Sequence, residues 1–272
     1  MAKKERLDVL VVERGLCETR EKAQKYIMAG MVLVDDQKVD KSGTKVSVES
    51  ALRLVGEPLP YASRGGFKLE EAFKRFPISM QDAVVVDLGA STGGFVDCAL
   101  QNGAKRVYAV DVGYGQLAWK LRTDERVINM EKTNARFLTP EDFPELMDWM
   151  TTDVAFISLT KILPAAYGIL KENGSGLALI KPQFEAGKEK VGKNGVVRDP
   201  LVHEEVIERI LSFNEELGFK TLGIVHSPIQ GPQGNIEYLY WFTKDQNVEG
   251  ITVDVHELVE RTFQDFGKKA GE

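Results

Sequence analysis

The sequence lacks a long apolar stretch. Its first apolar run, at 7–12, is short and carries Asp8, and no other run approaches the roughly 20 residues needed to cross a bilayer. No secretory signal is expected, because the charged residues at the N-terminus are followed by too short an apolar segment. We therefore expect a protein that stays in the cytoplasm and makes no contact with a membrane.

Cysteine and histidine are also scarce. The two cysteines, Cys17 and Cys98, cannot form a disulfide framework, which favours a reducing compartment. The three histidines are scattered along the chain, so the sequence predicts no metal site. Segment 203–205 (His-Glu-Glu) begins like a zinc-protease motif, but Ile207 occupies the place of the second histidine.

Positive charge is in short supply. The chain has 35 basic and 41 acidic residues and a formal net charge of −6 at pH 7. Its first 56 residues carry a small basic excess, whereas the remainder is acidic. A polyanion must therefore be met by local basic patches and not by the field of the whole protein, which argues against indiscriminate nucleic-acid binding.

Residues 1–56 are predicted to form a small α+β module. Helical apolar patterns start at Leu7 and span 20–29; Thr19 is placed to cap the second helix and Gly30 to end it. Short strands are expected at 31–34, 38–39, 45–48 and 52–55. Two prolines stop regular structure shortly afterwards, so 57–62 is predicted to be a linker and 63–272 a second domain.

The second domain alternates between strand and helix patterns. Strands are expected at 83–88, 106–111, 127–130, 153–157, 176–180, 221–226 and 238–243, with helices between the first six and a last helix at 255–266. This alternation predicts an α/β fold with a doubly wound, Rossmann-like sheet that is mostly parallel. The link between the last two strands has no helix pattern, so these strands are expected to form an antiparallel pair at one sheet edge.

A glycine-rich turn follows the first strand of this domain. Residues 87–95 read Asp-Leu-Gly-Ala-Ser-Thr-Gly-Gly-Phe, and such a turn between a strand and a helix lets the backbone approach a nucleotide-like ligand. Asp87 would oppose a pyrophosphate, but it suits a cofactor with an amino group and a positive centre. Asp111, at the end of the second strand, can hold ribose hydroxyls, and Asn134 can hydrogen-bond an adenine edge.

These features predict S-adenosylmethionine as the cofactor. The glycine spacing departs from the nicotinamide fingerprint, which makes a dehydrogenase the disfavoured alternative, and 187–194 departs from a P-loop because Asn194 replaces the magnesium ligand. The expected cofactor-binding residues are Asp87, Gly89, Ala90, Ser91, Thr92, Gly93, Gly94, Phe95, Asp111, Val112, Asn134 and Ala135.

Several motifs along the whole chain resemble those of the TlyA family, whose members join an RNA-binding module to an FtsJ-type methyltransferase domain. The module, named after ribosomal protein S-four, is matched at 6–8, 20–23, 27–30 and 32–34. The methyltransferase part is matched at 63–69, 87–95, 111–117, 153–158, 181–185 and 234–238.

The resemblance implies a Lys-Asp-Lys-Glu tetrad that methylates ribose 2′-hydroxyls, and the matching residues are Lys68, Asp153, Lys181 and Glu237. A 2′-hydroxyl is a poor nucleophile, so a base must take its proton as the methyl group moves. A lysine can be this base when burial and a second lysine lower its pKa, and we assign this role to Lys181. The other three residues are expected to orient the hydroxyl and tune Lys181. The transfer needs alignment and no metal.

Basic residues are the candidates for contact with RNA phosphates, although such a cluster is also typical of a solvated helix face. They are Arg6, Arg20, Lys22, Lys25, Lys41 and Arg64. The resemblance implies that the target is a cytidine ribose in ribosomal RNA, within ribosomal subunits or ribosomes, and it leaves the oligomeric state open. Two alternatives are a membrane-active haemolysin, a label that this family carries, and an RNA-binding ribosome assembly factor with a vestigial cofactor pocket. The lack of a spanning segment argues against the first, and the presence of all four tetrad residues argues against the second.

Overall fold

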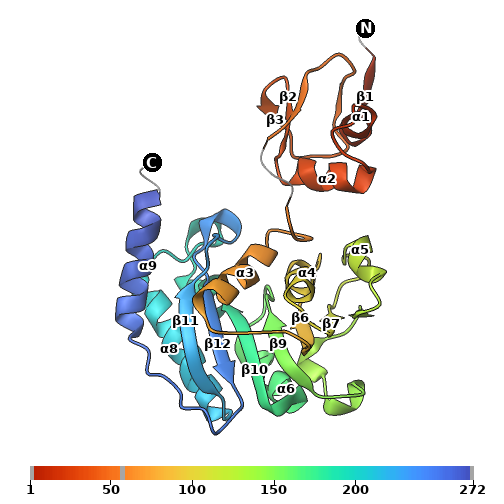
Figure 1. The fold of residues 1–272 in the computed structure, drawn as a ribbon. Coiled ribbons are helices and arrows are strands. Elements are labelled where there is room, and N and C mark those ends of the chain that lie inside the picture. The colour runs from red at the N-terminus through yellow and green to blue at the C-terminus, as the bar shows by residue number, and fades with distance from the viewer. Residues whose placement is uncertain (1–2, 56–58, 270–272) are drawn as a thin grey trace. The chain divides into compact units, whose positions relative to one another are not determined.

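The computed structural model describes residues 3–55 and 59–269 (Figure 1). The chain forms two compact units, Met1–Pro60 and Tyr61–Glu272. Residues 57 and 58 of the predicted linker lie outside the described residues. Tyr61 and Ala62, at the end of that predicted linker, are buried in the core of the second unit.

The N-terminal unit packs two helices against short strands. Its core is formed by apolar residues of both helices and of β2, among them Leu7, Ile27 and Val32. The Thr19 hydroxyl caps the second helix by accepting a hydrogen bond from the Lys22 amide at 3.2 Å. The elements are α1 (Leu7–Glu13), α2 (Arg20–Met28), β1 (Lys4–Arg6), β2 (Val32–Val34), β3 (Gln37–Lys38), β4 (Lys45–Ser47) and β5 (Leu52–Leu54). Sequence patterns missed β1, because its three charged residues carry no strand signal.

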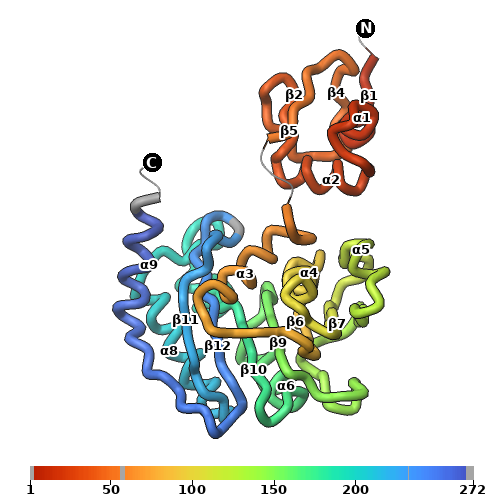
Figure 2. The backbone as a smooth tube through the Cα atoms, viewed as in Figure 1, coloured from red at the N-terminus to blue at the C-terminus, as the bar shows by residue number. Residues whose placement is uncertain are grey.

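The second unit is built on a seven-stranded sheet of order β11-β12-β10-β9-β6-β7-β8, counted over the described residues. β12 runs antiparallel to both of its neighbours, β10 and β11, and the other pairs are parallel, a path that the tube in Figure 2 follows. The predicted doubly wound, mostly parallel sheet with an antiparallel last strand is thus confirmed. The strands are β6 (Val84–Leu88), β7 (Arg106–Val110), β8 (Val127–Met130), β9 (Met147–Thr152), β10 (Leu170–Ile180), β11 (Lys220–His226) and β12 (Tyr238–Thr243).

Helices cover both faces of this sheet (Figure 1). Successive strand side chains point to opposite faces, so Val84 and Val86 join a core with α6, α8 and α9, whereas Val85 joins a core with α3 and α4. The helices are α3 (Gly66–Arg75), α4 (Gly94–Gln101), α5 (Trp119–Arg122), α6 (Leu163–Ile169), α7 (Pro182–Glu185), α8 (Pro200–Glu216) and α9 (Val255–Lys269). None of the described helices is long and apolar enough to cross a membrane.

The strand predicted at 153–157 is wrong. The strand in this region is β9, which ends at Thr152, and the following loop places Phe156 at a φ of 63° with 90% of its surface exposed. Polar residues interrupt the apolar pattern of β9, so the sequence does not predict this strand. In the fold their side chains make hydrogen bonds. The Asp148 carboxylate accepts a hydrogen bond from the Val84 amide at 2.8 Å, and the Thr152 hydroxyl donates to the Leu88 carbonyl at 2.9 Å.

The helix predicted between β8 and β9 is also wrong. The chain makes two 3₁₀ turns there instead, η1 (Ala135–Phe137) and η2 (Pro140–Asp142), because Pro140 and Pro144 interrupt an α-helix. β10 starts at Leu170, earlier than predicted, and its pairing with β9 shifts register before Ser175. Further 3₁₀ turns are η3 (Leu159–Lys161), η4 (Lys188–Lys190), η5 (Lys193–Gly195) and η6 (Pro232–Gly234).

The strand order reverses between β6 and β9. From β6 the chain adds β7 and β8 on one side, and then crosses to add β9 and β10 on the other. Ligands of open α/β sheets bind outside the carboxyl ends of the strands at such a switch point. The residues that follow β6, β9 and β10 are therefore brought to one place.

Candidate active site

The glycine-rich turn occupies the carboxyl end of β6. Gly93 caps α4 at a φ of 91°, a conformation that favours glycine. A Cβ atom on Gly94 would lie 2.4 Å from Ser63 Oγ and 2.8 Å from the Gly66 nitrogen, so only glycine lets α3 approach the start of α4 this closely. The positive φ of Gly93 and the close contact at Gly94 therefore account for glycine at both positions.

Asp87 lies in β6 beside this turn and is 2% exposed. Its Oδ1 atom accepts a hydrogen bond from the Thr151 hydroxyl at 2.8 Å. Burial raises the pKa of the Asp87 carboxyl to about 7, although the hydrogen bond from Thr151 works in the opposite direction. The carboxylate is thus held in place but is costly to ionise without a cationic partner.

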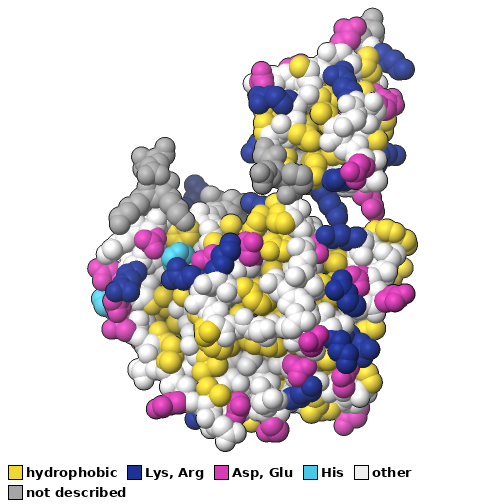
Figure 3. All heavy atoms as spheres, in the orientation of Figure 1, with side chains coloured by type: hydrophobic (Ala, Val, Ile, Leu, Met, Phe, Trp, Pro, Cys, Tyr) yellow, Lys and Arg dark blue, Asp and Glu magenta, His cyan; other side chains and the backbone are white. Residues whose placement is uncertain are grey.

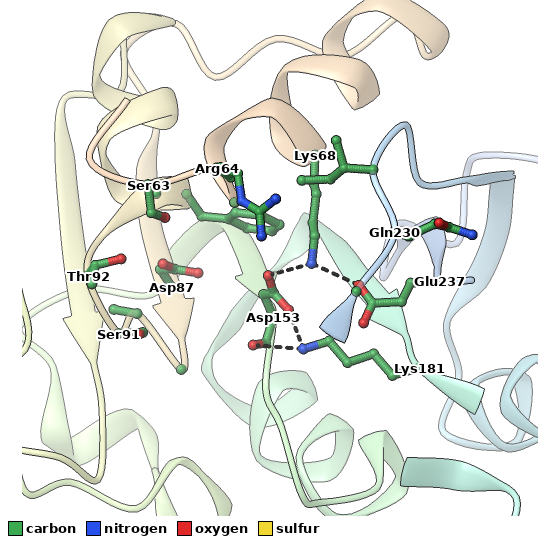
Figure 4. Close-up of a pocket in the computed structure, with 17 residues that line it drawn as sticks. Ser63, Arg64, Lys68, Asp87, Ser91, Thr92, Asp153, Lys181, Gln230 and Glu237 are labelled. Carbon is green, nitrogen blue, oxygen red and sulfur yellow. Dashed lines mark hydrogen bonds and ion pairs between the residues drawn. The ribbon is translucent and has the colours of Figure 1, made fainter. Parts of the chain in front are cut away.

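A cavity of about 460 Å³ joins the turn to the predicted tetrad. Figure 4 shows Asp87, Ser91 and Thr92 on one side of it and Lys68, Asp153, Lys181 and Glu237 on the other. Its lining consists of Ser63, Arg64, Gly65, Lys68, Asp87, Gly89, Ala90, Ser91, Thr92, Gly94, Phe95, Asp153, Lys181, Ile229, Gln230, Gly231 and Glu237. Gly93 is absent from this lining; a Cβ there would meet Leu121 and Leu117 instead.

A second cavity, of about 540 Å³, shares Gly89, Ser91 and Asp153 with the first. Asp111 stands at this cavity, and its two oxygens accept hydrogen bonds from the Ser91 amide at 2.8 Å and the Gly113 amide at 2.7 Å. The remaining predicted cofactor residues, Val112, Asn134 and Ala135, line it as well. The side-chain oxygen of Asn134 accepts from the Arg136 amide at 3.1 Å, so it caps η1.

The tetrad forms a chain of alternating charges. Lys68 Nζ donates to Asp153 Oδ2 at 3.1 Å and to Glu237 Oε2 at 2.8 Å, and Lys181 Nζ lies 2.5 Å from Asp153 Oδ1 (Figure 4). Lys68 lies on α3, Asp153 and Lys181 directly follow β9 and β10, and Glu237 directly precedes β12. The side chains of Lys68, Lys181 and Glu237 are buried, and that of Asp153 is 21% exposed.

The two lysines differ in their partners. Burial lowers the pKa of the Lys68 ammonium, but Asp153 and Glu237 outweigh burial, and the net pKa is raised. Lys68 pairs with two carboxylates, whereas Lys181 pairs with Asp153 alone among the described residues. Lys68 is therefore a permanent hydrogen-bond donor at neutral pH.

The predicted RNA-binding residues fall into three groups. Arg64 is exposed and lines the first cavity. Arg6 and Arg20 both pair with the fully buried Asp8, at 2.9 and 3.0 Å, while keeping about half of their side chains exposed. The third group consists of lysines: Lys22 pairs with Glu18 at 3.4 Å, whereas Lys25 and Lys41 make no ion pair with a described residue. On the face shown in Figure 3, basic and acidic side chains are interspersed.

Sequence reasoning missed some residues of the site. The Gln183 side chain donates to Glu237 Oε1 at 3.0 Å, and Gly231 approaches the same oxygen so closely that a Cβ would lie 2.2 Å from it. Gln183 belongs to the matched segment 181–185, and Gly231 to the glycine- and proline-rich link before Glu237. Both segments could be recognised in the sequence, the first by its motif and the second by its glycines and prolines. Neither pattern shows that Gln183 and Gly231 contact Glu237.

The comparisons with known families show which class of protein this is. Residues 61–244 match the FtsJ-like methyltransferase family, and residues 5–52 match the S4 domain, so the second unit is a methyltransferase domain. The chain belongs to the TlyA family of methyltransferases.

Relatives cover nearly the whole chain. It is 57% identical to a candidate rRNA methyltransferase, YqxC of Bacillus subtilis, over 88% of this chain and 85% of the relative. It is 43% identical to the 16S/23S rRNA (cytidine-2′-O)-methyltransferase TlyA of Mycobacterium tuberculosis, over 95% and 98%. A solved structure of a candidate hemolysin from Streptococcus thermophilus matches all of both chains, with 47% identity and a TM-score of 0.79.

Proposed function

We propose that this protein transfers a methyl group from S-adenosylmethionine to a ribose 2′-hydroxyl of ribosomal RNA, and that the ribose belongs to a cytidine. The observation that carries the proposal is that the Lys-Asp-Lys-Glu array and the glycine-rich turn line one cavity. The relatives that are rRNA (cytidine-2′-O)-methyltransferases by name support the choice of substrate. The S4 domain supports an RNA target.

The residues around the turn fit this cofactor. Asp87 offers a carboxylate for an amino group, the turn offers backbone beside the cavity, and Asp111 and Asn134 line the adjoining cavity where an adenosine would be held. The bound cofactor supplies an electrophilic methyl group on a positively charged sulfur. A buried carboxylate whose pKa is raised by burial gains most from a cationic ligand, which makes the charge of the cofactor part of its recognition.

The charge pattern favours Lys181 over Lys68 as the base. Lys68 is held by two carboxylates and keeps its proton, so it can orient Asp153 and Glu237 but cannot accept the hydroxyl proton. In the proposed reaction Lys181 first releases its own proton to solvent and then takes the proton of the 2′-hydroxyl at Nζ. The ribose oxygen gains the methyl group as the bond from methyl to sulfur breaks. Asp153 holds Lys181 in place.

Cofactor binding is expected to weaken below pH 7. The Asp87 carboxyl has a pKa of about 7, so it is mostly protonated at pH 6, and only its ionised form attracts the cofactor's amino group. The dissociation constant should rise by up to about tenfold for each pH unit below 7. Calorimetric titration from pH 6 to 8 measures this slope. An Asp87→Asn variant should bind weakly at every pH, and an equal slope in this variant would assign the pH effect to another group.

RNA affinity is expected to depend on Lys25 and Lys41, which carry charge without an ion-pair partner among the described residues. Replacing either by alanine should weaken binding to rRNA and flatten the logarithmic dependence of affinity on salt by roughly one counterion per lysine removed. Filter binding at several salt concentrations measures both quantities. Lys105→Ala is the matched control, because Lys105 is exposed at the amino end of β7, at the opposite edge of the sheet from the cavity. An unchanged salt slope in both variants would remove these lysines from the interface.

The proposed function is tested by supplying radiolabelled S-adenosylmethionine with unmodified ribosomes, separate subunits or free rRNA, and mapping 2′-O-methylation. We expect label on a cytidine ribose. Label on a base, or no label on any RNA, would contradict the proposal. Lysis of red cells by protein that methylates no RNA would support the haemolysin alternative.

A further inference from the structure

The one-turn helix α7 directly follows Lys181 and starts with Pro182. Three successive side chains of this turn contact three other parts of the active site. Gln183 reaches Glu237, Phe184 contacts Phe156 with 4.9 Å between ring centroids, and Glu185 reaches the segment after Asp153. A single turn thus connects Lys181 to Glu237 and to the loop that follows Asp153.

Gln183 completes the hydrogen bonding of Glu237. Glu237 is 1% exposed; its Oε2 atom accepts from Lys68 at 2.8 Å and its Oε1 atom from Gln183 Nε2 at 3.0 Å. A carboxylate only accepts hydrogen bonds, so the amide nitrogen of Gln183 must face it, which fixes the orientation of the amide. With both oxygens held, Glu237 is fixed in one orientation toward Lys68.

Glu185 performs a similar role for the loop that carries Asp153. It is 6% exposed, and its carboxylate accepts from the Leu159 amide and the Ser158 hydroxyl, both at 2.7 Å. Arg209 of α8 lies 3.4 Å from the same carboxylate and neutralises it. The loop from Asp153 to η3 is therefore tied at its far end to the turn that starts at Lys181.

We propose that Gln183 and Glu185 are positioning residues for methyl transfer, which hold Glu237 and the Asp153 loop in register with Lys181. This inference rests on the proposed function. Gln183 suits the role because an amide donates to Glu237 without adding charge, whereas a cation would compete with Lys68 for Glu237 and an anion would repel it.

Replacing Gln183 by methionine should lower kcat by about tenfold, the typical effect of removing a hydrogen bond to a charged group. The KM for RNA and the dissociation constant of the cofactor should stay within about twofold, because Gln183 lies outside the lining of the cavity that contains the glycine-rich turn. Gln264→Met is the matched control, since Gln264 makes the same kind of bond, to Glu260 at 3.2 Å, on the exposed surface of α9. A kcat within twofold of wild type would overturn the role of Gln183.

A Gln183→Glu variant supplies a readout that a merely structural role would not give. When its new carboxyl is protonated, it can donate to Glu237 as the amide does; when ionised, it repels Glu237. The ratio of variant to wild-type kcat should therefore rise as pH is lowered. A ratio that stays constant with pH would contradict the proposal, and this measurement still decides the matter if the methionine variant fails to fold.

Glu185→Gln should lower kcat by about tenfold, because one of its two accepting oxygens becomes a donor facing Leu159 N–H or the Ser158 hydroxyl. Glu208→Gln is the control, because it makes the same substitution at an exposed glutamate of α8. Unchanged kcat for Glu185→Gln would remove Glu185 from the proposal. If the wild-type protein methylates no ribose, the proposed function itself fails; if it does and both variants match their controls, only this inference fails.

Discussion

Replacing Lys181 by methionine should lower the rate of methyl transfer by about a thousandfold while leaving cofactor affinity within about twofold. Lys181 lies at the end of β10, 2.5 Å from Asp153, and it is the lysine of the array with a single acidic partner among the described residues. Methionine keeps the unbranched side chain up to the ε position but removes the amine that accepts the hydroxyl proton in the proposed reaction. Single-turnover methylation of rRNA measures the rate, and calorimetry measures cofactor binding.

Lys161→Met provides the control for this substitution, because Lys161 is exposed on η3. Wild-type and Lys161→Met protein should transfer methyl at equal rates. Turnover of the Lys181→Met protein at more than about a tenth of the wild-type rate would show that another group takes the proton.

Replacing Lys68 by methionine should lower the free energy of unfolding by about 3–5 kcal/mol, the usual cost of leaving a buried charge without its partner. Glu237 is 1% exposed and pairs with Lys68 at 2.8 Å, so removal of the ammonium leaves its carboxylate with the neutral Gln183 as its only side-chain donor among the described residues. Denaturant unfolding of the single variant against wild type measures the loss.

The double variant Lys68→Met/Glu237→Gln separates this electrostatic cost from the loss of packing around α3. Its glutamine carries no charge, so it should recover most of the stability while remaining inactive. If the double variant is as unstable as the single one, the loss comes from packing around position 68 and not from the unpaired Glu237 carboxylate.

The fold could be read from the sequence where hydrophobic patterns are strong. The apolar run 83–86 predicted β6, because a strand that is buried on both faces reads as a continuous apolar segment. β9 could not be located in this way, since Asp148, Thr151 and Thr152 find their hydrogen-bond partners only in the folded sheet. The neighbouring apolar residues at 154–157 suggested a strand there instead, but in the fold they form a loop.

The residues that line the cavity could be predicted in part from motifs, but their arrangement could not. Motif resemblance predicted that Lys68 and Glu237 act in one reaction. Their contact joins residues 169 positions apart in the sequence and depends on β12 lying beside β10, so no local pattern could show it. The hydrogen bond from Gln183 and the close approach of Gly231 depend on the same packing, and no local pattern reports either.

The antiparallel insertion of β12 has a consequence for the newborn chain. Glu237 reaches the site because it precedes β12, and β12 lies between β10 and β11, both of which precede it in the sequence. During synthesis Lys68, Asp153 and Lys181 therefore leave the ribosome well before Glu237 and β12. Until β12 has left the exit tunnel and entered the sheet, the nascent enzyme lacks one of the two carboxylates that pair with Lys68. The Lys-Asp-Lys-Glu array is thus completed only when β12 joins the sheet, after the other three residues of the array have been synthesised.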